Sequence, residues 1–472
     1  QQGSGKTAVV YHYAKYLHNT NKVLNAFVLA PAIATNLTWN EFLYNNGEVF
    51  TVLKTFKDFD RIKPETFIII SDSMLGKLKK GLKKYIRKCY NKLCLIFDES
   101  DEISNPDTSR TKETLSIFRR LSNKMLATGT TTRNNVAEFY PQLELLYNNS
   151  VNMVSTCEYT YYQNKDKEIE STHNDYYGEP FPPRGGATHF KRCFCPGKAS
   201  VFGIEKLNQD IYNADELLEI TGKIIITRKF REFAGDKYDI SSITVMPTVE
   251  EQEVFIKIIK EFYRLRQQFY KSTGDGRKDA ALKLALQIKL LIKACSTPTE
   301  FPDYKGDKFF SKARVICQEI EEIKGKVAVG CTSIKAVKAY KNFFKQQFPH
   351  RKLFVIMGEI DFDRRLSITK RFEETENGIL LCTQQSLKSS ANIPSCDEVF
   401  LEALKWNMPR MEQFFCRFIR FDSEGFTRVR MVTYANSIEQ NLLAMIMDKQ
   451  RSNDFMGSGI VTEEQEIFEE YG

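Results

Sequence analysis

Short apolar runs recur along the first third of the chain, separated by segments whose apolar residues follow helical spacing. The runs lie within 25–31, 65–73, 93–103 and 124–132. An unbroken apolar run of this length suits a strand buried on both faces, as in a parallel sheet. Between the runs, segments such as TAVVYHYAKYLHN at 7–19 place apolar residues three and four positions apart. Strands that alternate with helices predict an α/β fold with a doubly wound parallel sheet.

The alternation of apolar runs with helical spacing is less regular after the first third of the chain. Residues 151–222 are rich in Tyr, Pro, Gly and mixed charge, which predicts short strands and loops. They form either an irregular connection with buried tyrosines or an insertion that binds nucleic acid. Residues 249–295 predict two amphipathic helices separated by the loop STGDGR at 272–277. The stretch KLKKGLKKYIRKCYNK at 77–92 is half basic, typical of a solvated helix face, with a duplex-facing patch as the alternative.

Composition narrows the class of protein. With 472 residues, of which 42% are hydrophobic, two or three domains are expected. No apolar run approaches the ~20 residues that cross a bilayer, so we expect no membrane partner and an intracellular location, in cytoplasm or nucleus. The net charge of +8 permits a polyanionic partner. The 11 cysteines are scattered, and Cys193 and Cys195 lack a second pair at zinc-ligand spacing, which favours reduced thiols.

The first residues, QQGSGKT, contain the end of a phosphate-binding loop, Gly3-Ser4-Gly5-Lys6-Thr7. In the pattern G-x-x-x-x-G-K-[ST], backbone N–H groups and a helix N-terminus hold phosphate oxygens. Lys6 would reach the β- and γ-phosphates, and the Thr7 hydroxyl would bind Mg²⁺. The alternative is a flexible turn that precedes a helix.

An acidic pair supports the first interpretation. Asp98 and Glu99 follow the apolar run LCLIF, about ninety residues after the loop. The carboxyl ends of parallel strands form the edge where α/β sheets bind ligands. Asp98 would hold Mg²⁺ through water, and Glu99 would polarise the attacking water. An acidic helix cap is the alternative for this pair.

Further segments of the first half carry a family resemblance. FVLAPAIATNLTWNEF at 27–42 contributes Pro31, Trp39, Glu41 and Phe42, and ATGTTTRNN at 127–135 contributes Thr128, Gly129 and Thr130. DESDEISN at 98–105 has Asp101 where the family has His. With the loop and the acidic pair, these segments resemble the motifs of superfamily-two helicases, and within them the Swi/Snf-like double-stranded DNA translocases.

The second half continues the resemblance in the family's order. GKVAVGCTS at 325–333, LLCTQQSLKSSANIPSCDEVF at 380–400 and WNMPRMEQFFCRFIR at 406–420 are similar to its later motifs. Gln413, Arg417 and Arg420 are spaced at i, i+4 and i+7, which predicts that they share one face of a helix. Arginines there would act as fingers on the γ-phosphate, with a solvated basic helix face as the alternative.

The resemblance implies two RecA-like lobes with helical and irregular insertions, and ATP and Mg²⁺ as cofactors between the lobes. It implies nucleotide contacts from Gly3, Ser4, Gly5, Lys6, Thr7, Asp98 and Gln413, metal binding by Thr7 and Asp98, and catalytic roles for Glu99, Arg417 and Arg420. It implies coupling through Thr128, Gly129 and Thr130, and nucleic-acid contacts from Pro31, Ser71, Thr332, Thr383, Asn392 and Trp406.

The implied function is an ATP-dependent motor that translocates on double-stranded DNA and moves or remodels protein–DNA complexes, with replication, repair or transcription proteins as further partners. A strand-separating DNA or RNA helicase and a motor-like binding protein with weakened turnover are the alternatives. Asp101 and the loop at 380–400, which lacks the family's glycines, keep the last alternative open. The Asn-, Lys- and Tyr-rich composition suits a virus or phage, which would place the protein in host cytoplasm or virion.

The motifs also set the expected domains. Lobe 1 spans residues 1–150 and is followed by an insertion or connection at 151–222. A linker with a helical protrusion covers 223–304, lobe 2 covers 305–450, and an acidic tail covers 451–472. Because the first motif is incomplete, we expect the chain to be part of a longer polypeptide.

Overall fold

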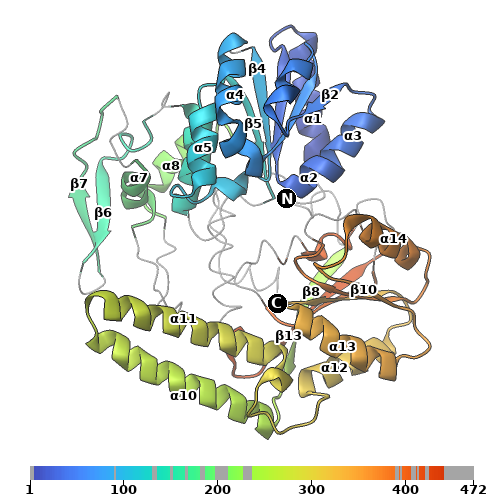
Figure 1. Cartoon of the computed structure of the whole chain (residues 1–472). Coiled ribbons are helices and arrows are strands. Elements are labelled where there is room, and N and C mark those ends of the chain that lie inside the picture. The colour runs from blue at the N-terminus through green and yellow to red at the C-terminus, as the bar shows by residue number, and fades with distance from the viewer. Residues whose placement is uncertain are drawn as a thin grey trace. The chain divides into compact units, whose positions relative to one another are not determined.

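The structure is a computed structural model of the chain (Figure 1). It describes residues 5–440 apart from 90–91, 130–135, 149–151, 165–167, 181–185, 197–210, 227–236, 388–392, 394–395, 405–410, 412–413 and 420–424. The chain divides into two compact units, the first mainly from residues 1–198 and 208–230 and the second mainly from 231–450.

The first unit is built on a parallel sheet in the order β2-β3-β1-β4-β5. Its strands are β1 (Asn25–Ala30), β2 (Phe50–Val52), β3 (Phe67–Ser71), β4 (Leu93–Asp98) and β5 (Asn123–Ala127). Its helices include α1 (Lys6–Asn19), α2 (Ala32–Ala34), α3 (Asn40–Asn45), α4 (Leu75–Lys88), α5 (Ser109–Phe118) and α6 (Tyr140–Tyr147). Short turns of 3-10 or π type are η1 (Thr35–Trp39), η2 (Phe56–Arg61), η3 (Asp72–Met74), η4 (Ser100–Ile103) and η5 (Val136–Phe139).

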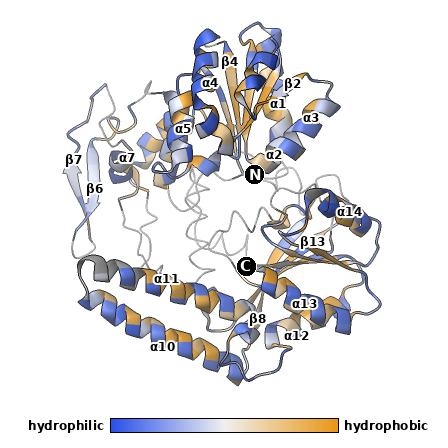
Figure 2. Cartoon of the chain, viewed as in Figure 1, coloured by the Kyte–Doolittle hydropathy of each residue, from blue (hydrophilic) through white to orange (hydrophobic). Residues whose placement is uncertain are grey.

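The apolar runs form the strands they predict. All six residues of β1 are buried, and both neighbouring strands pair with it in parallel. One face of the sheet packs with Leu75, Leu78 and Leu82 of α4, and the other packs with α1. Figure 2 shows the strands as an apolar layer between helices whose outer faces are hydrophilic. The α/β architecture predicted from the sequence is confirmed.

The next segment of the first unit contains more helix than we expected for 151–222. A hairpin of β6 (Tyr159–Gln163) and β7 (Ile169–His173) is followed by α7 (Gly186–Phe194) and α8 (Ala214–Thr221). Cys157, Cys193, Phe190 and Leu217 lie in its apolar core. All 11 cysteines lie in the described part of the chain, where they are buried and form no disulfide bond.

The second unit contains a six-stranded parallel sheet in the order β10-β11-β9-β12-β13-β8. Its strands are β8 (Tyr238–Val245), β9 (Val327–Cys331), β10 (Leu353–Ile356), β11 (Ile379–Thr383), β12 (Glu398–Leu401) and β13 (Thr427–Tyr434). Its helices are α10 (Val249–Lys271), α11 (Gly274–Ser296), η6 (Pro298–Glu300), α12 (Ser311–Glu322), α13 (Ile334–Gln347) and α14 (Phe362–Glu373). The two sheets therefore confirm the prediction of two RecA-like lobes.

The helices α10 and α11 form a hairpin that shares a core of Phe262, Leu265, Phe269 and Leu284. The loop predicted at 272–277 is too long, because α11 already begins at Gly274. The strand β8 also lies within the segment that we expected to link the lobes, but it pairs with β13 along its whole length. Even with this long hairpin, none of the helices in the described ranges is long and apolar enough to cross a membrane.

Candidate nucleotide-binding site

The helix α1 begins directly at the predicted phosphate loop. Gly5 precedes it with φ 71° and ψ 20°, a left-handed conformation that glycine adopts without steric cost. A Cβ atom built on Gly5 would meet nothing within 4 Å, so the space beside this backbone is open. Lys6 and Thr7 form the first turn, where backbone N–H groups have no helical acceptor. Gly3 and Ser4 lie outside the described residues.

Asp98 ends β4 and is held by two donors. The indole Nε1–H of Trp39 donates to Asp98 Oδ2 at 2.9 Å, and the backbone N–H of Glu99 donates to Oδ1 at 3.1 Å. Burial raises the pKa of Asp98, whereas the Trp39 hydrogen bond and the charge of Lys6 lower it. The structure therefore brings the predicted loop lysine and the predicted metal ligand into one electrostatic environment.

The role of Trp39 was missed from the sequence. Trp39 counted only as part of a motif, yet it is fully buried and reaches the carboxylate of Asp98 from the π-helical turn η1. An indole N–H is a donor only, so it holds the carboxylate without competing for a cation. The only sequence signal was a tryptophan eight residues after the Pro31 that follows β1.

Glu99 has a strained backbone. Its φ of 56° and ψ of 50° lie in the left-handed region, which is rare for a residue with a long side chain. Such a conformation costs on the order of 1–3 kcal/mol and persists where the surrounding structure imposes it. The strain occurs at the residue predicted to polarise water.

Asp101, the departure from the family pattern, forms a specific contact. The Thr128 hydroxyl donates to Asp101 Oδ1 at 2.9 Å, and Asp101 is only 5% exposed. The contact joins the turn after β4 to the residue that follows β5. Thr128 and Gly129 thus lie at the same sheet edge as Asp98, while Thr130 lies outside the described residues.

A second polar network occupies the neighbouring part of this edge. Arg110 of α5 pairs with Asp72 (Nε to Oδ2, 3.1 Å) and with Glu102. Burial raises the pKa of Asp72, and the Arg110 charge opposes that rise. Ser71, predicted to contact nucleic acid, bonds to Asp72 and Ser73. Pro31 is half-buried and follows Ala30, which pairs with Ser71 in the sheet register.

The second sheet also places predicted residues at its carboxyl edge. Thr332 follows β9, and both its backbone N–H (2.7 Å) and its hydroxyl (2.9 Å) donate to Oε1 of Glu402. Ser296 of α11 donates to the same oxygen at 3.0 Å. Burial raises the pKa of Glu402, which is fully buried and was missed from the sequence. Thr383 is 7% exposed and bonds to Ser386, so it presents little surface to a ligand.

Residues 311–422 match the family model described as the helicase conserved C-terminal domain. This part of the chain is therefore similar to the C-terminal domain of helicases. The match confirms the predicted resemblance to superfamily-two helicases. No curated protein sequence matches the chain.

Two solved structures are similar to the whole chain or to part of it. The SWI2/SNF2 ATPase core of Sulfolobus solfataricus in complex with dsDNA is 15% identical, covers 100% of this chain and 91% of its own length, and has a TM-score of 0.35. The C-terminal part of the Fun30 ATPase domain is 10% identical, covers 48% of this chain and 98% of its own length, and has a TM-score of 0.37. We base no argument on these likenesses, because both TM-scores are low.

Within residues 311–422, the helix predicted to carry Gln413, Arg417 and Arg420 ends before Arg417. The helical residues end at Phe415, and the backbone N–H of Arg417 donates to the Phe414 carbonyl, three residues back. A turn of this kind places Arg417 outside the regular helix on which the predicted spacing depends. Arg417 is half-buried. Gln413, Arg420, Asn392 and Trp406 lie outside the described residues.

Proposed function

We propose that the protein is an ATP-driven nucleic-acid motor, and that it translocates on double-stranded DNA. The observation that carries the proposal is the juxtaposition of Lys6, at the start of α1, with the partly buried carboxylate of Asp98, at the end of β4. Both lie at a sheet edge of the kind where parallel α/β domains bind ligands.

The residues fit a magnesium nucleotide. The open space beside Gly5 leaves room for phosphate oxygens next to the N-terminus of α1, whose N–H groups and dipole favour anions. Thr7 supplies a hydroxyl and Asp98 a carboxylate, and hard cations prefer such oxygen ligands. Lys6 and Thr7 would therefore hold phosphate and metal, with Asp98 as the further metal ligand.

Each residue then has a defined task. Bound ATP supplies the phosphoanhydride bond whose hydrolysis drives the motor. Trp39 orients Asp98 by donating to Oδ2, and this hydrogen bond lowers the carboxyl pKa against the rise that burial causes. Glu99 would orient water and accept its proton. Arg417 and Arg420 would stabilise charge on the phosphates, and Gln413 would contact the nucleotide, as the helicase resemblance implies.

Nucleic-acid binding is proposed for the residues at the two sheet edges. Pro31 and Ser71 would contribute from the first unit and Thr332 from the second, with Asn392 and Trp406, whereas the buried Thr383 would hold the turn after β11 through its bond to Ser386. Thr128 and Gly129, joined to the acidic turn through Asp101, would couple hydrolysis to movement. Preference for duplex DNA, without full strand separation, rests on the motif resemblance to Swi/Snf-like translocases.

An ATPase measurement with and without duplex DNA tests the proposal. We expect duplex DNA to stimulate turnover, and Lys6→Ala to abolish it while the melting temperature stays unchanged. Full turnover in Lys6→Ala would overturn the nucleotide site. Stronger stimulation by single-stranded RNA would exclude the duplex translocase, and displacement of a labelled strand would favour the unwinding alternative.

A further inference from the structure

The helix α4 (Leu75–Lys88) has two contrasting faces. One face is fully buried in the core of the first sheet through Leu75, Leu78 and Leu82. The rest of the helix is basic, with Lys77, Lys79, Lys80, Lys83, Lys84, Arg87 and Lys88. We call these side chains the α4 basic face. Figure 2 shows α4 as one of the most hydrophilic helices of the first sheet's cover.

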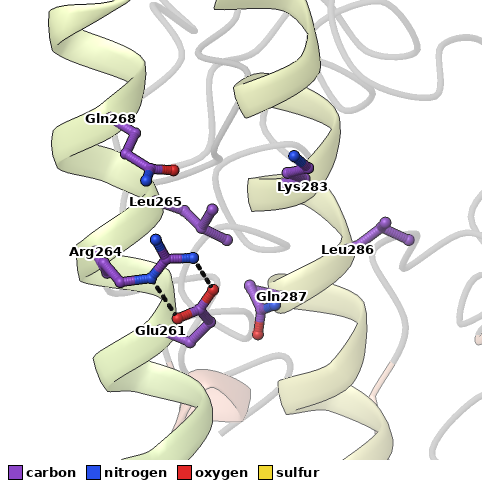
Figure 3. A pocket seen from close by; sticks show the side chains of 7 residues that line it. All are labelled: Glu261, Arg264, Leu265, Gln268, Lys283, Leu286 and Gln287. Carbon is purple, nitrogen blue, oxygen red and sulfur yellow. Dashed lines mark hydrogen bonds and ion pairs between the residues drawn. The ribbon is translucent and has the colours of Figure 1, made fainter.

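The charges of the α4 basic face are not neutralised by neighbours. The helix has no Asp or Glu, and none of its basic side chains forms an ion pair with any residue the structure describes. Other helices differ in this respect. The α10 helix pairs Glu261 with Arg264, as Figure 3 shows, and α11 pairs Asp279 with Lys283.

The positive charges of the α4 basic face destabilise the helix that carries them. Lys80 and Lys84 are four residues apart, as are Lys84 and Lys88, and like charges at this spacing destabilise a helix. The nearest acidic side chains give little relief. Glu113 of α5 lies against Gly76 in the first turn, and the Asp58 carboxylate accepts the backbone N–H groups of Lys54 and Thr55.

We propose that the α4 basic face binds the phosphate backbone of nucleic acid, as a contact region additional to the carboxyl edges of the sheets. This inference deepens the proposed motor function and rests on it. A helix of 14 residues is about 21 Å long. A duplex carries about one charge per 1.7 Å of its axis, so several phosphates lie within reach of one such helix.

The chemistry of the face favours nucleic acid over an acidic protein. Protein interfaces depend on buried aromatic or aliphatic anchors, with charge at the rim. The whole of α4 is described, and none of its large apolar side chains is exposed. Phosphate contacts need only cationic side chains, and these contacts carry no sequence information.

The test compares two double charge reversals in the full chain. Lys77→Glu/Lys84→Glu changes two exposed residues seven positions apart on α4. Arg364→Glu/Arg371→Glu makes the same charge change at the same spacing on α14, which also carries Asp363 and Glu373. Binding to a fluorescent 30-base-pair DNA duplex is measured over a range of salt concentrations, together with the melting temperature and the ATPase rate without DNA.

We expect the α4 variant to bind the duplex about ten-fold more weakly and to reduce the slope of log K against log[salt] by about 1–2, because each lost phosphate contact contributes about 0.9. Its melting temperature should stay equal or rise, since the carboxylate introduced at position 84 would face Lys80 and Lys88. The α14 variant should change affinity less than about twofold by the same measure.

Unchanged affinity and slope in the α4 variant would overturn the inference, as would an equal loss in both variants. Binding of polyglutamate in place of the duplex would indicate an acidic protein partner and would also overturn it. Turnover without DNA separates this outcome from failure of the motor itself. If Lys6→Ala loses the ATPase rate without DNA while the α4 variant binds the duplex with unchanged affinity, the proposed motor function stands. In that case only the α4 basic face is excluded as a contact region.

Discussion

The carboxyl edges of the two sheets carry similar residue types in different environments. In the first unit, Asp98 is only partly buried and is held by the N–H donors of Trp39 and Glu99. In the second, Glu402 and Glu439 are fully buried. A carboxylate that keeps access to solvent can still bind a cation, whereas one enclosed by protein donors holds its neighbours in place. The same residue type therefore serves binding at one edge and architecture at the other.

Lys312 and Glu439 form a fully buried ion pair in the second unit. Lys312 Nζ lies 2.8 Å from Glu439 Oε2, both side chains are 0% exposed, and the Tyr434 backbone N–H also donates to Glu439. The ammonium group lies over the Tyr434 ring. Glu251, at the third position of α10, accepts from Ser311 and from the Tyr434 hydroxyl, which fixes the hairpin to the sheet.

The largest effect should come from breaking this buried pair. Lys312→Met leaves the Glu439 carboxylate buried without its cation, so we expect a loss of about 3–5 kcal/mol in unfolding free energy. Lys312→Met/Glu439→Gln should recover most of that loss. Denaturant unfolding measures both, with Arg264→Met at the exposed Glu261 pair as a control worth less than about 1 kcal/mol. A double variant as unstable as the single one would show that the charges are not the cause.

The contrasting change at the first edge should affect turnover instead of stability. Glu99→Gln removes the proposed base, and we expect the DNA-stimulated ATPase rate to fall about 10²–10³-fold or more. Because the amide is isosteric, the unfolding free energy should stay within about 0.5 kcal/mol of the original. Retained turnover would move the catalytic role away from Glu99.

A smaller effect is expected from the link between the two turns of the first edge. Thr128→Val removes the hydroxyl that donates to Asp101, a net loss of about 1 kcal/mol, or about five-fold. We expect the DNA-stimulated rate to fall by about that factor while the rate without DNA is unchanged. Thr128→Ser keeps the hydroxyl and should restore stimulation. Equal losses in both rates would assign Thr128 to the chemical step.

The smallest effect concerns pH. Burial raises the pKa of Glu402, so the folded state binds the proton more tightly than the unfolded state. Its contribution to stability is therefore present below the ordinary glutamate pKa of about 4.3 and is lost as pH rises towards the folded pKa. Glu402→Gln should show a smaller fall in melting temperature between pH 5 and pH 8 than the unaltered protein. The exposed Glu374→Gln serves as control and should leave the fall unchanged.

Much of the fold could be predicted because burial leaves a direct signal in the sequence. The apolar runs at 25–31, 65–73 and 93–98 suit strands that are covered on both faces, and the structure has β1, β3 and β4 at these places. Gly5, Lys6, Asp98 and Glu99 were found for a similar reason, since turn geometry and strand ends restrict their positions. The helix predicted through 413–420 ends before Arg417, because spacing alone does not show where a helix ends.

The sequence by itself determined the parallel strands of the first sheet, the glycine at the start of α1 and the acidic end of β4, because these depend on local periodicity and on the order of residues. Only the tertiary structure decided the partners. Trp39 meets Asp98 across 59 positions of the chain, and Ser296 meets Glu402 across 106. Such pairs form where strands distant in sequence end at one sheet edge, and the burial they create there decides which carboxylates can bind and which can only hold the fold.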